Sequence, residues 1–457
     1  WHNLVHSMSY PGEDSWWDTP YHLQTNGSFV KGGDPSPGVA QTTDWTGPGP
    51  GGTCYSISET RHSGEYILTG RVVTMTTESS VFETGGVLVR DGIIGAVWAG
   101  DSIPSAHAGI QVIDTEGTIY PGLIDSHNHI HYNTVPLWDL EGSIYTNRYQ
   151  WKNHPGYKPE VTWPKTLLSS GSYWNMEFEA LKYAEMKSIV GGTTAVQGNP
   201  TGDENAYTSI LSRNVEHYNF GRDEMHTKVT ELEDEYVGNH IKTGSAAGTL
   251  DAWFLHLSEG TDSSSLNEFQ ILVDNDLLVP ELMLIHGVPL TASEYSLMGA
   301  VGASLVWSPT SNLLLYGQTA DVAAAHEAGV NIALAPDWSP SGSKSPLHEL
   351  KLADWLDTHR MGNVFTDYEQ VQMVTTNVVD GIGWASDVGR IQPGLAADLL
   401  VVDSFHQDPY RNLIDAIDPD VTLTVVGGLP IYGDVEIMDQ LKGEDKEIVT
   451  WNGMIVV

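Results

Sequence analysis

Cysteine is almost absent from this chain. The 457 residues include a single cysteine, Cys54, so an intrachain disulfide is impossible. The fold must be held by burial instead, and 40% of the residues are hydrophobic, an ordinary fraction for a globular protein. A chain of this length can bury a sizeable core and is long for one compact domain.

Long apolar runs are also missing. No stretch reaches 18 consecutive apolar residues, so the sequence predicts no membrane span. The chain begins with Trp1, which we interpret as a removed signal peptide or a trimmed start. Together with the shortage of cysteine, this favours a secreted or periplasmic location.

Positive charge is scarce. Lysine and arginine number 21 against 59 acidic residues, and 21 − 59 leaves a net charge of −38. Such a surface repels nucleic acid and anionic membranes, so neither is an expected partner. We interpret the excess as adaptation to a saline or extracellular setting; the alternative is that acidic charge simply improves solubility.

The composition divides the chain into three predicted parts. Residues 1–62 are turn-rich and irregular, and we expect an extension that wraps the body or serves an interface. Residues 63–118 and 389–457 are rich in strand-forming residues, with Asp91-Gly92 as a hairpin signal. We therefore expect one composite β-sandwich built from both ends, around a catalytic domain at 119–388.

The middle of the chain alternates strands with helices, which indicates parallel βα units. Helices are predicted at Met176–Val190, Leu266–Leu277 and Thr319–Ala328. Seven strands are visible where a closed (β/α)₈ barrel needs eight. The missing strand falls between residues 200 and 250, with Thr227–Leu232 as a weak candidate. The seven strands are Ile119–Ile124, Thr193–Gln197, Val215–Phe220, Ala252–Leu257, Glu281–Ile285, Ser304–Trp307 and Asn331–Ala335.

The segment 120–133, YPGLIDSHNHIHYN, places two histidines at the end of a predicted buried strand. Residues two apart in an extended chain point to the same side, so His127 and His129 leave the strand together. Imidazole nitrogens are suitable ligands for a divalent metal.

Further polar residues end three other predicted strands. His256 and Glu259 follow in FLHLSEG, His286 in LIHG, and Asp337 in IALAPDW. The carboxyl ends of barrel strands face one mouth, so these side chains are expected to converge with His127 and His129. Imidazole and carboxylate groups are ligands for a divalent metal, so these six residues could share one site.

At this point the chain resembles the amidohydrolase superfamily, in its triazine hydrolase and S-adenosylhomocysteine deaminase-like branch. The matching segments span about 119–404 in family order: PGLIDSHNH, EMKSIVGGTTAV, HLSE, IHGVPLTASE, SPTSNLLL, AGVNIALAPD and GRIQPGLAADLLVVD. The resemblance implies a distorted TIM barrel, an α/β fold, with a composite β-sandwich.

The resemblance also implies a set of roles. One divalent metal would be held by His127, His129, His256 and Asp337, with zinc the first choice and iron or manganese as alternatives. Glu259 would be the proton shuttle. His286 would hydrogen-bond the attacking water or the substrate's leaving centre. Asp337, besides ligating, would orient the nucleophile.

Two features depart from the family pattern. Relatives often carry His or Asn before the Pro of SPTSN, where this chain has Trp307-Ser308, and this puts a deaminase substrate in doubt. The segment after His129 is long and aromatic; it forms either a pocket wall or packing beneath the N-terminal extension.

Lys228 and Lys242 are the only lysines where a metal-bridging lysine would be expected, and neither sits in a convincing strand end, so one metal is favoured.

The sequence therefore predicts a metal-dependent hydrolase of a non-peptide carbon–nitrogen bond. It would deaminate an aminated heterocycle or open a small cyclic amide, both small-molecule substrates, and a homo-oligomer is expected. Two alternatives stay open. One is a binuclear dipeptidase- or lactonase-like hydrolase. The other is an acidic extracellular assembly protein with an idle or structural metal, against which Glu259 argues.

Overall fold

The computed structural model describes residues 64–443 except 141, 171, 199–210, 217–219, 221–224 and 229–234. It also describes the backbone of four short strands near the chain ends: β1 (Tyr21–Leu23), β2 (Phe29–Lys31), β18 (Val449–Trp451) and β19 (Met454–Val456). Apart from β1 and β2, the predicted extension at 1–62 lies outside the described residues. Within the described part, no helix has both the length and the apolar character needed to cross a bilayer.

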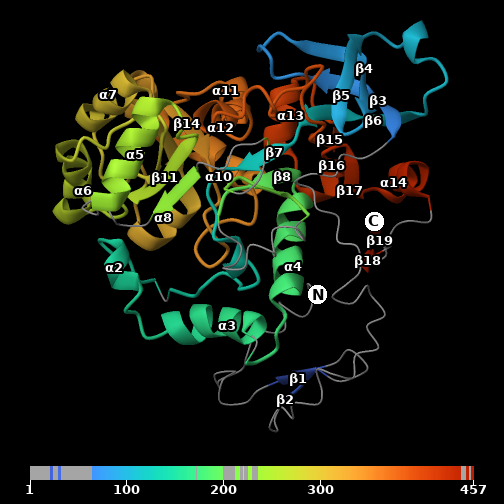
Figure 1. Cartoon of the computed structure of the whole chain (residues 1–457). Coiled ribbons are helices and arrows are strands. Elements are labelled where there is room, and N and C mark those ends of the chain that lie inside the picture. The colour runs from blue at the N-terminus through green and yellow to red at the C-terminus, as the bar shows by residue number, and fades with distance from the viewer. Residues whose placement is uncertain are drawn as a thin grey trace.

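A seven-stranded sheet joins the two ends of the chain, at the upper right of Figure 1. Its strand order is β17-β16-β15-β6-β3-β4-β5. The strands are β3 (Glu65–Val73), β4 (Val81–Arg90), β5 (Ile93–Ala99), β6 (Val112–Pro121), β15 (Leu399–Asp403), β16 (Val421–Val426) and β17 (Leu429–Gly433). The two sequence halves meet where β15 pairs antiparallel with β6. A sheet built from both ends was thus correctly predicted, while the domain boundaries themselves stay a prediction.

The hairpin between β4 and β5 shows how local sequence specifies this sheet. Asp91 and Gly92 both adopt positive φ, at 50° and 79°, as a tight hairpin between twisted strands requires. Valines and isoleucines of β3, β4, β6 and β15 then pack into one buried cluster. Helix α14 (Val435–Lys442) contributes Ile437 and Met438 to the same cluster.

Among the described residues, eight strands in two parallel sheets build the barrel that the sequence predicts. Their bounds are β7 (Leu123–Asp125), β8 (Thr193–Val196), β9 (Arg213–Asn214), β10 (Met225–Lys228), β11 (Ala252–Leu257), β12 (Leu282–His286), β13 (Ser304–Trp307) and β14 (Asn331–Leu334). They pair as β7-β8-β9 and β10-β11-β12-β13-β14. A parallel bridge between Asn128 and Asp337 joins the last strand to the first.

Two strand predictions need correction. The run Ile119–Ile124 is not one strand: β6 runs to Pro121 in the seven-stranded sheet, and barrel strand β7 begins at Leu123. The chain crosses between the two sheets at Gly122, where a Cβ would lie 2.2 Å from the Thr194 methyl, so glycine is required. The third barrel strand is Arg213–Asn214, and the described residues of the predicted strand Val215–Phe220, namely 215, 216 and 220, lie outside it.

The strand missing from the sequence-based count is β10, which overlaps the weak candidate Thr227–Leu232 at its first two residues. It pairs in parallel with β11, Met225 opposite Ala252 and Lys228 opposite Leu255. The sequence MHTK has neither a run of apolar residues nor a regular alternation, so periodicity could not identify it.

The barrel strands alternate between two apolar environments. Phe254, Ile285 and Val306 belong to the cluster that fills the barrel interior, while Leu255, Leu284 and Leu305 pack outward against the helices. His256 continues the interior register of β11. The principal outer helices are α4 (Glu177–Ile189), α5 (Glu235–Ala247), α6 (Ser263–Asp274), α7 (Ala292–Val301), α8 (Pro309–Tyr316), α9 (Val322–Glu327), α10 (Pro346–Leu356), α11 (Asp367–Gln372) and α12 (Thr376–Gly381).

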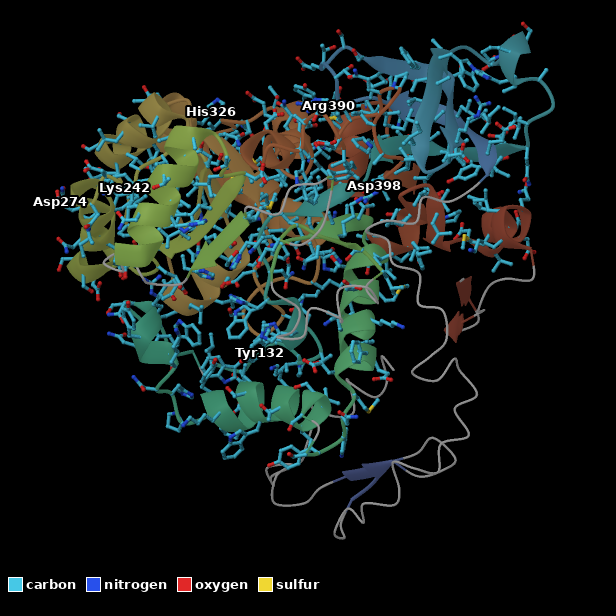
Figure 2. The ribbon with its side chains drawn as sticks, viewed as in Figure 1. Tyr132, Lys242, Asp274, His326, Arg390 and Asp398 are labelled. Carbon is cyan, nitrogen blue, oxygen red and sulfur yellow. The ribbon has the colours of Figure 1, made fainter. Side chains whose placement is uncertain are left out.

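The segment between β7 and α4 lies apart from the helical ring and crosses the end of the barrel, below it in Figure 1. It holds the short helix α2 (Arg148–Trp151) and helix α3 (Trp163–Ser169). Tyr132 lies in this region, between α3 and the barrel (Figure 2). The arrangement places the segment beside the carboxyl ends of the strands, where the predicted site residues gather.

Candidate functional site

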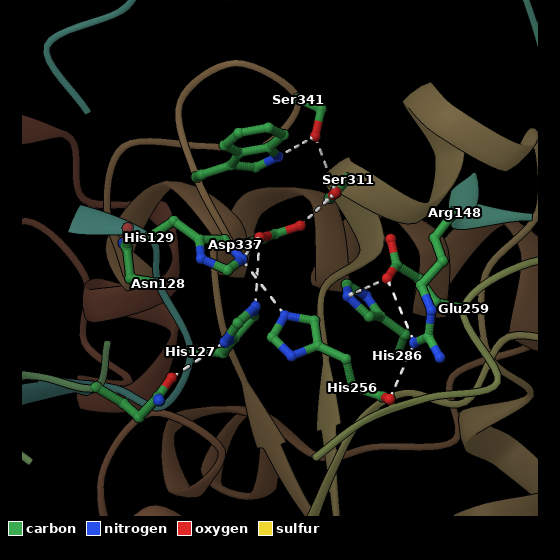
Figure 3. A network of polar contacts seen from close by, with 12 residues as sticks. His127, Asn128, His129, Arg148, His256, Glu259, His286, Ser311, Asp337 and Ser341 are labelled. Carbon is green, nitrogen blue, oxygen red and sulfur yellow. Dashed lines mark hydrogen bonds and ion pairs between the residues drawn. The ribbon is translucent and has the colours of Figure 1, made fainter. Parts of the chain in front are cut away.

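Three separate strand ends bring the four predicted ligands into one cluster (Figure 3). His127 and His129 follow β7, His256 lies in β11, and Asp337 follows β14. Asp337 has φ of 68°, a sharp departure from the strand, and its backbone is hydrogen-bonded to His127 and His129. These bonds fix the three groups relative to one another before any ligand is considered.

The distances between the ligand atoms match those around one small cation. His127 Nε2 and His129 Nε2 lie 3.3 and 3.6 Å from Asp337 Oδ1. His256 Nε2 lies 3.3 Å from His129 Nε2. Ligand atoms bound at about 2.0–2.2 Å to a tetrahedral zinc are about 3.3–3.6 Å apart, so each of these three pairs has the spacing found around such an ion.

The environment of His127 supports the same arrangement. Its Nδ1 lies 3.0 Å from Gln197 Oε1, an acceptor, so Nδ1 carries the hydrogen and Nε2 presents its lone pair. Gln197 is held in turn by Glu216, 2.5 Å from its amide nitrogen. His127 Nε2 is buried and has no hydrogen-bond partner among the described residues. A buried nitrogen that has a free lone pair and lies beside other potential ligand atoms is placed as a metal ligand would be.

Burial and charge set the protonation states. Burial holds the pKa of His256 well below its usual value, and it lowers the pKa of His286 to about 3, so both rings are neutral. Burial opposes ionisation of Asp337, but the His127 ring, 3.3 Å from its Oδ1, keeps its pKa below the usual range. Neutral imidazoles and an ionised carboxylate are the forms that bind a divalent cation.

Glu259 is buried beside this cluster. Its Oε2 lies 3.7 Å from His286 Nε2, and its Oε1 accepts a hydrogen bond of 2.6 Å from the Tyr316 hydroxyl. Burial raises the pKa of Glu259 to about 7, although Arg148 and Tyr316 oppose that shift. A carboxyl group that titrates near neutrality can both accept and return a proton.

Arg148 ties the segment after β7 to the site. Its guanidinium donates to the His256 carbonyl at 2.9 Å, contacts Glu268 at 2.7 Å, and lies 3.8 Å from Glu259 Oε2. Its backbone N–H donates to the Glu259 carbonyl, and Asn147 forms a β-bridge with Gly260. The side chain is 3% exposed, so its charge acts in a low-dielectric interior.

Asp337 is also supported from the other side. Ser311 donates to its Oδ2 at 2.6 Å, and Ser311 lies 3.1 Å from Ser341, which accepts from the Trp338 indole. Oδ2 is therefore engaged by protein, whereas Oδ1 faces His127 and His129. Because Oδ2 is already hydrogen-bonded, Oδ1 is the carboxylate oxygen that is available to a metal.

The aromatic segment forms a wall at the site. Trp138, Trp151, Tyr316 and Trp338 belong to one buried cluster, against which Tyr132 packs. The Trp338 ring lies 5.6 Å from that of His129, and the Trp151 indole donates to the Tyr316 hydroxyl, which holds Glu259. Of the two alternatives for this segment, the described residues support a wall of the site.

Lys228 and Lys242, the two lysines considered for a metal bridge, lie in different kinds of element. Lys242 lies in helix α5, away from any strand end, as predicted. Lys228, however, is the last residue of β10, the fourth barrel strand, so the expectation that it lies outside a strand end is wrong. The irregular sequence of β10 concealed that position. In the same strand Thr227 is the residue that contacts Gln197, 3.3 Å away.

Several residues of the site were not predicted from the sequence: Arg148, Gln197, Asn312, Ser311 and Tyr316. Asn312 and Ser311 lie within SPTSNLLL, so that motif offered a signal. Gln197 ends a predicted strand and could have been noticed for the same reason as His256. Arg148 and Tyr316 had no sequence signal, because tertiary packing alone brings them to Glu259.

Fold and site together define a class. The barrel carries three histidines and an aspartate at its mouth, beside a buried glutamate. This combination is that of a metal-dependent hydrolase. The family model described as "Amidohydrolase family" matches residues 203–431, half of the chain. The chain belongs to the amidohydrolase family, and it is an enzyme that acts on carbon–nitrogen bonds other than peptide bonds.

Curated relatives agree with this assignment. The 5-methylthioadenosine/S-adenosylhomocysteine deaminase of Symbiobacterium thermophilum is 24% identical over 418 residues, covering 80% of this chain and 92% of that protein. The protein of the same name from Halobacterium salinarum is 25% identical over 370 residues, covering 72% and 85%.

Solved structures share the fold. A guanine deaminase from Bradyrhizobium japonicum has a TM-score of 0.61 at 18% identity, covering 81% of this chain and 100% of that one. An adenosine deaminase from Xanthomonas campestris, solved with bound zinc, has a TM-score of 0.59 at 19% identity, covering 80% and 93%. Atrazine chlorohydrolase from Arthrobacter aurescens, complexed with zinc, has a TM-score of 0.60 at 17% identity, covering 80% and 94%.

Proposed function

We propose that this enzyme is a mononuclear, zinc-dependent deaminase of an aminated purine-type heterocycle. His127, His129, His256 and Asp337 would hold the ion. When bound, a divalent ion makes water nucleophilic at neutral pH and polarises the bond under attack. The other steps of the proposal concern the protein's own side chains.

The observation that carries the proposal is the placement of Glu259. It lies three residues after His256, is almost fully buried, and has a pKa near 7. A purely structural metal site has no use for such a group. Its Oε1 is occupied by Tyr316, so Oε2, which faces His286, is the atom that exchanges the proton.

In the reaction, water adds to the ring carbon that carries the amino group, and the carbon–nitrogen bond then breaks. Glu259 Oε2 accepts a proton from the attacking water and returns it to the departing nitrogen. Ammonia leaves, and the ring retains a carbonyl, so one water is consumed for each ammonia released. His286 and the aromatic wall hold the substrate while Glu259 cycles between its two states.

The heterocycle is supported by the wall and by the names of the relatives. Trp338 and Trp151, whose rings lie 5.7 Å apart at an interplanar angle of 52°, provide an aromatic, apolar boundary beside His129. Such a surface suits a planar ring better than a flexible chain. The two curated relatives are deaminases of adenosine-like compounds by name.

Turnover by the zinc-loaded protein tests the proposal. Methylthioadenosine, adenosine, guanine and a six-membered cyclic amide would be assayed for ammonia release and for loss of ring absorbance. Ammonia from at least one of the three purines is expected. Opening of the cyclic amide with no purine turnover would replace deamination by amide hydrolysis.

A second candidate rests on Lys228. Because this residue ends the fourth barrel strand, a binuclear hydrolase with a bridging modified lysine deserves a direct test. Elemental analysis of purified protein decides between the two. We expect about one metal per chain, unchanged in Lys228→Met, with iron or manganese as alternatives to zinc. Two metals, one of them lost in Lys228→Met, would establish the binuclear enzyme.

The setting of the enzyme is proposed from its charge. We propose that the net charge of −38 is an adaptation to a saline setting. We further propose a secreted or periplasmic location and a homo-oligomer. Fractionation of the source cells and sedimentation analysis of the purified protein test these two statements.

A further inference from the structure

A chain of hydrogen bonds behind the site begins at Trp307, the residue that departs from the family pattern. The Trp307 indole Nε1–H donates to the Thr319 hydroxyl at 2.7 Å. Thr319 donates to Asn312 Oδ1 at 3.3 Å. Asn312 Nδ2 lies 3.0 Å from His286 Nδ1. This series of hydrogen bonds thus links β13, α8 and the end of β12.

The chemistry of these groups gives the chain a direction. An indole nitrogen can only donate, so the Thr319 oxygen accepts from Trp307, and the Thr319 hydroxyl faces Asn312 Oδ1, to which it donates its own hydrogen. Asn312 therefore presents its carbonyl oxygen to Thr319 and its NH₂ group to His286. With a donor opposite, His286 Nδ1 must accept, and the ring hydrogen of the neutral imidazole lies on Nε2.

This tautomer decides which histidines can bind the ion. His127 belongs to two groups of possible ligands, one with His129 and Asp337, the other with His256 and His286. A protonated Nε2 has no lone pair to offer a cation. His286 instead directs an N–H toward Glu259 Oε2, 3.7 Å away, and toward the space where the substrate reacts.

We propose that Trp307, Thr319 and Asn312 are positioning residues that hold His286 as the neutral Nε2–H tautomer. Held in this form, His286 keeps on Nε2 the hydrogen that it needs for the role implied by the family resemblance, a hydrogen bond to the attacking water. The assignment of the tautomer stands on the hydrogen bonds alone, while its effect on turnover rests on the proposed deaminase function. The two parts are tested by different measurements.

The tautomer is measured without substrate. Zinc-loaded protein labelled with ¹⁵N histidine would be studied by long-range proton–nitrogen NMR, with the His286→Gln spectrum identifying the signal. In the native protein we expect hydrogen on Nε2 and none on Nδ1. Thr319→Val, which preserves shape but removes the hydroxyl, should give a mixture of tautomers. Asn312→Asp, which offers only acceptors, should place hydrogen on Nδ1.

Turnover supplies the second measurement. Thr319→Val should lower kcat about 2–10-fold, the loss of one ordinary hydrogen bond, with KM nearly unchanged. Asn312→Asp should lower kcat about 10²–10³-fold, as removal of one positioned donor does elsewhere. The metal content of both variants should stay at the native value.

Thr193→Val is the matched control. Thr193 is a buried threonine of β8 whose hydroxyl has no hydrogen-bond partner among the described residues. Its replacement should change neither the His286 signal nor kcat.

Three results would overturn the proposal. One is native His286 with Nε2 bound to the metal or with hydrogen on Nδ1, which means the opposite orientation of Asn312. Another is a native-like tautomer in both Thr319→Val and Asn312→Asp, because any loss of kcat would then reflect packing. The last is a shifted tautomer with full kcat. If no substrate is found, the NMR result still decides the tautomer.

Discussion

Two buried arginines at different places in the molecule use carboxylates in different ways. Arg213 of β9 makes two short contacts to Asp398, at 2.6 and 2.9 Å, and the Gly427 N–H donates to the same carboxylate. Asp398 lies where the barrel meets the seven-stranded sheet (Figure 2). Arg148 at the site instead divides its guanidinium among Glu268, the His256 carbonyl and, at 3.8 Å, Glu259.

The difference separates a structural pair from a chemical one. Both oxygens of Asp398 are engaged at short distance, so the pair is fully committed to joining the barrel and the sheet. Glu259 keeps Oε2 without a close donor among the described residues, because Arg148 stands off and His286 is 3.7 Å away. Burial raises the pKa of Glu259 to about 7, and its Oε2 has no close hydrogen-bond donor in the described part of the chain, so this carboxylate can accept and release a proton.

The largest expected effect comes from removing the proton carrier. Glu259→Gln keeps the shape and the bond to Tyr316 but cannot cycle a proton, so kcat should fall about 10²–10⁴-fold with full metal content. His256→Ala should lose the metal and all activity. Metal analysis and steady-state kinetics on the same preparations check both. A Glu259→Gln enzyme with native turnover would remove Glu259 from the mechanism.

Breaking the structural pair should affect stability and leave chemistry unchanged. Arg213→Met strands the buried Asp398 carboxylate, and loss of one partner of a buried pair costs about 3–5 kcal/mol. Urea unfolding should show that loss. The activity of each folded molecule should stay native, since Arg213 contacts no group of the site described above. A large fall in kcat with native stability would contradict the division drawn between the two arginines.

The pH profile tests how Arg148 acts. Glu259 must be ionised to accept a proton, so kcat/KM should fall as the pH drops through about 7. Arg148 opposes the rise of that pKa, so Arg148→Met should move the acid limb to higher pH. Tyr316→Phe, removing the second opposing group, should shift it in the same direction but less. An acid limb that stays in place in Arg148→Met would show that this arginine only holds the fold.

Salt should produce the smallest effect, and it distinguishes surface charge from buried charge. With 38 excess negative charges, the melting temperature should rise as salt screens repulsion, most steeply below physiological ionic strength. The stability lost in Arg213→Met should be nearly independent of salt, because buried pairs are poorly screened. Melting of both proteins across a sodium chloride series checks this. A midpoint that does not rise for the native protein would exclude net repulsion as a significant term.

The sequence by itself determined the barrel, the sheet shared by both ends, and the candidate set His127, His129, His256, Glu259, His286 and Asp337. Each of these residues lies at the end of an apolar strand or shortly after it, and parallel strands of a barrel end at one mouth, so local pattern was sufficient. The similarity of several motifs to one family supplied the reaction class. Strand β10 was not predicted from the sequence, because four residues without periodicity carry no local signal.

Only the tertiary structure decided which of those groups act on one another. Arg148 lies 111 positions before Glu259, and Tyr316 lies 57 positions after it, yet both meet its carboxylate in the interior. The direction of the Trp307–Thr319–Asn312 chain likewise depends on which donor faces which acceptor, a property of packing and not of order along the chain. Hydrogen bonds and charges act over a few ångströms, so distances that sequence spacing does not record set the pKa of Glu259 and the tautomer of His286.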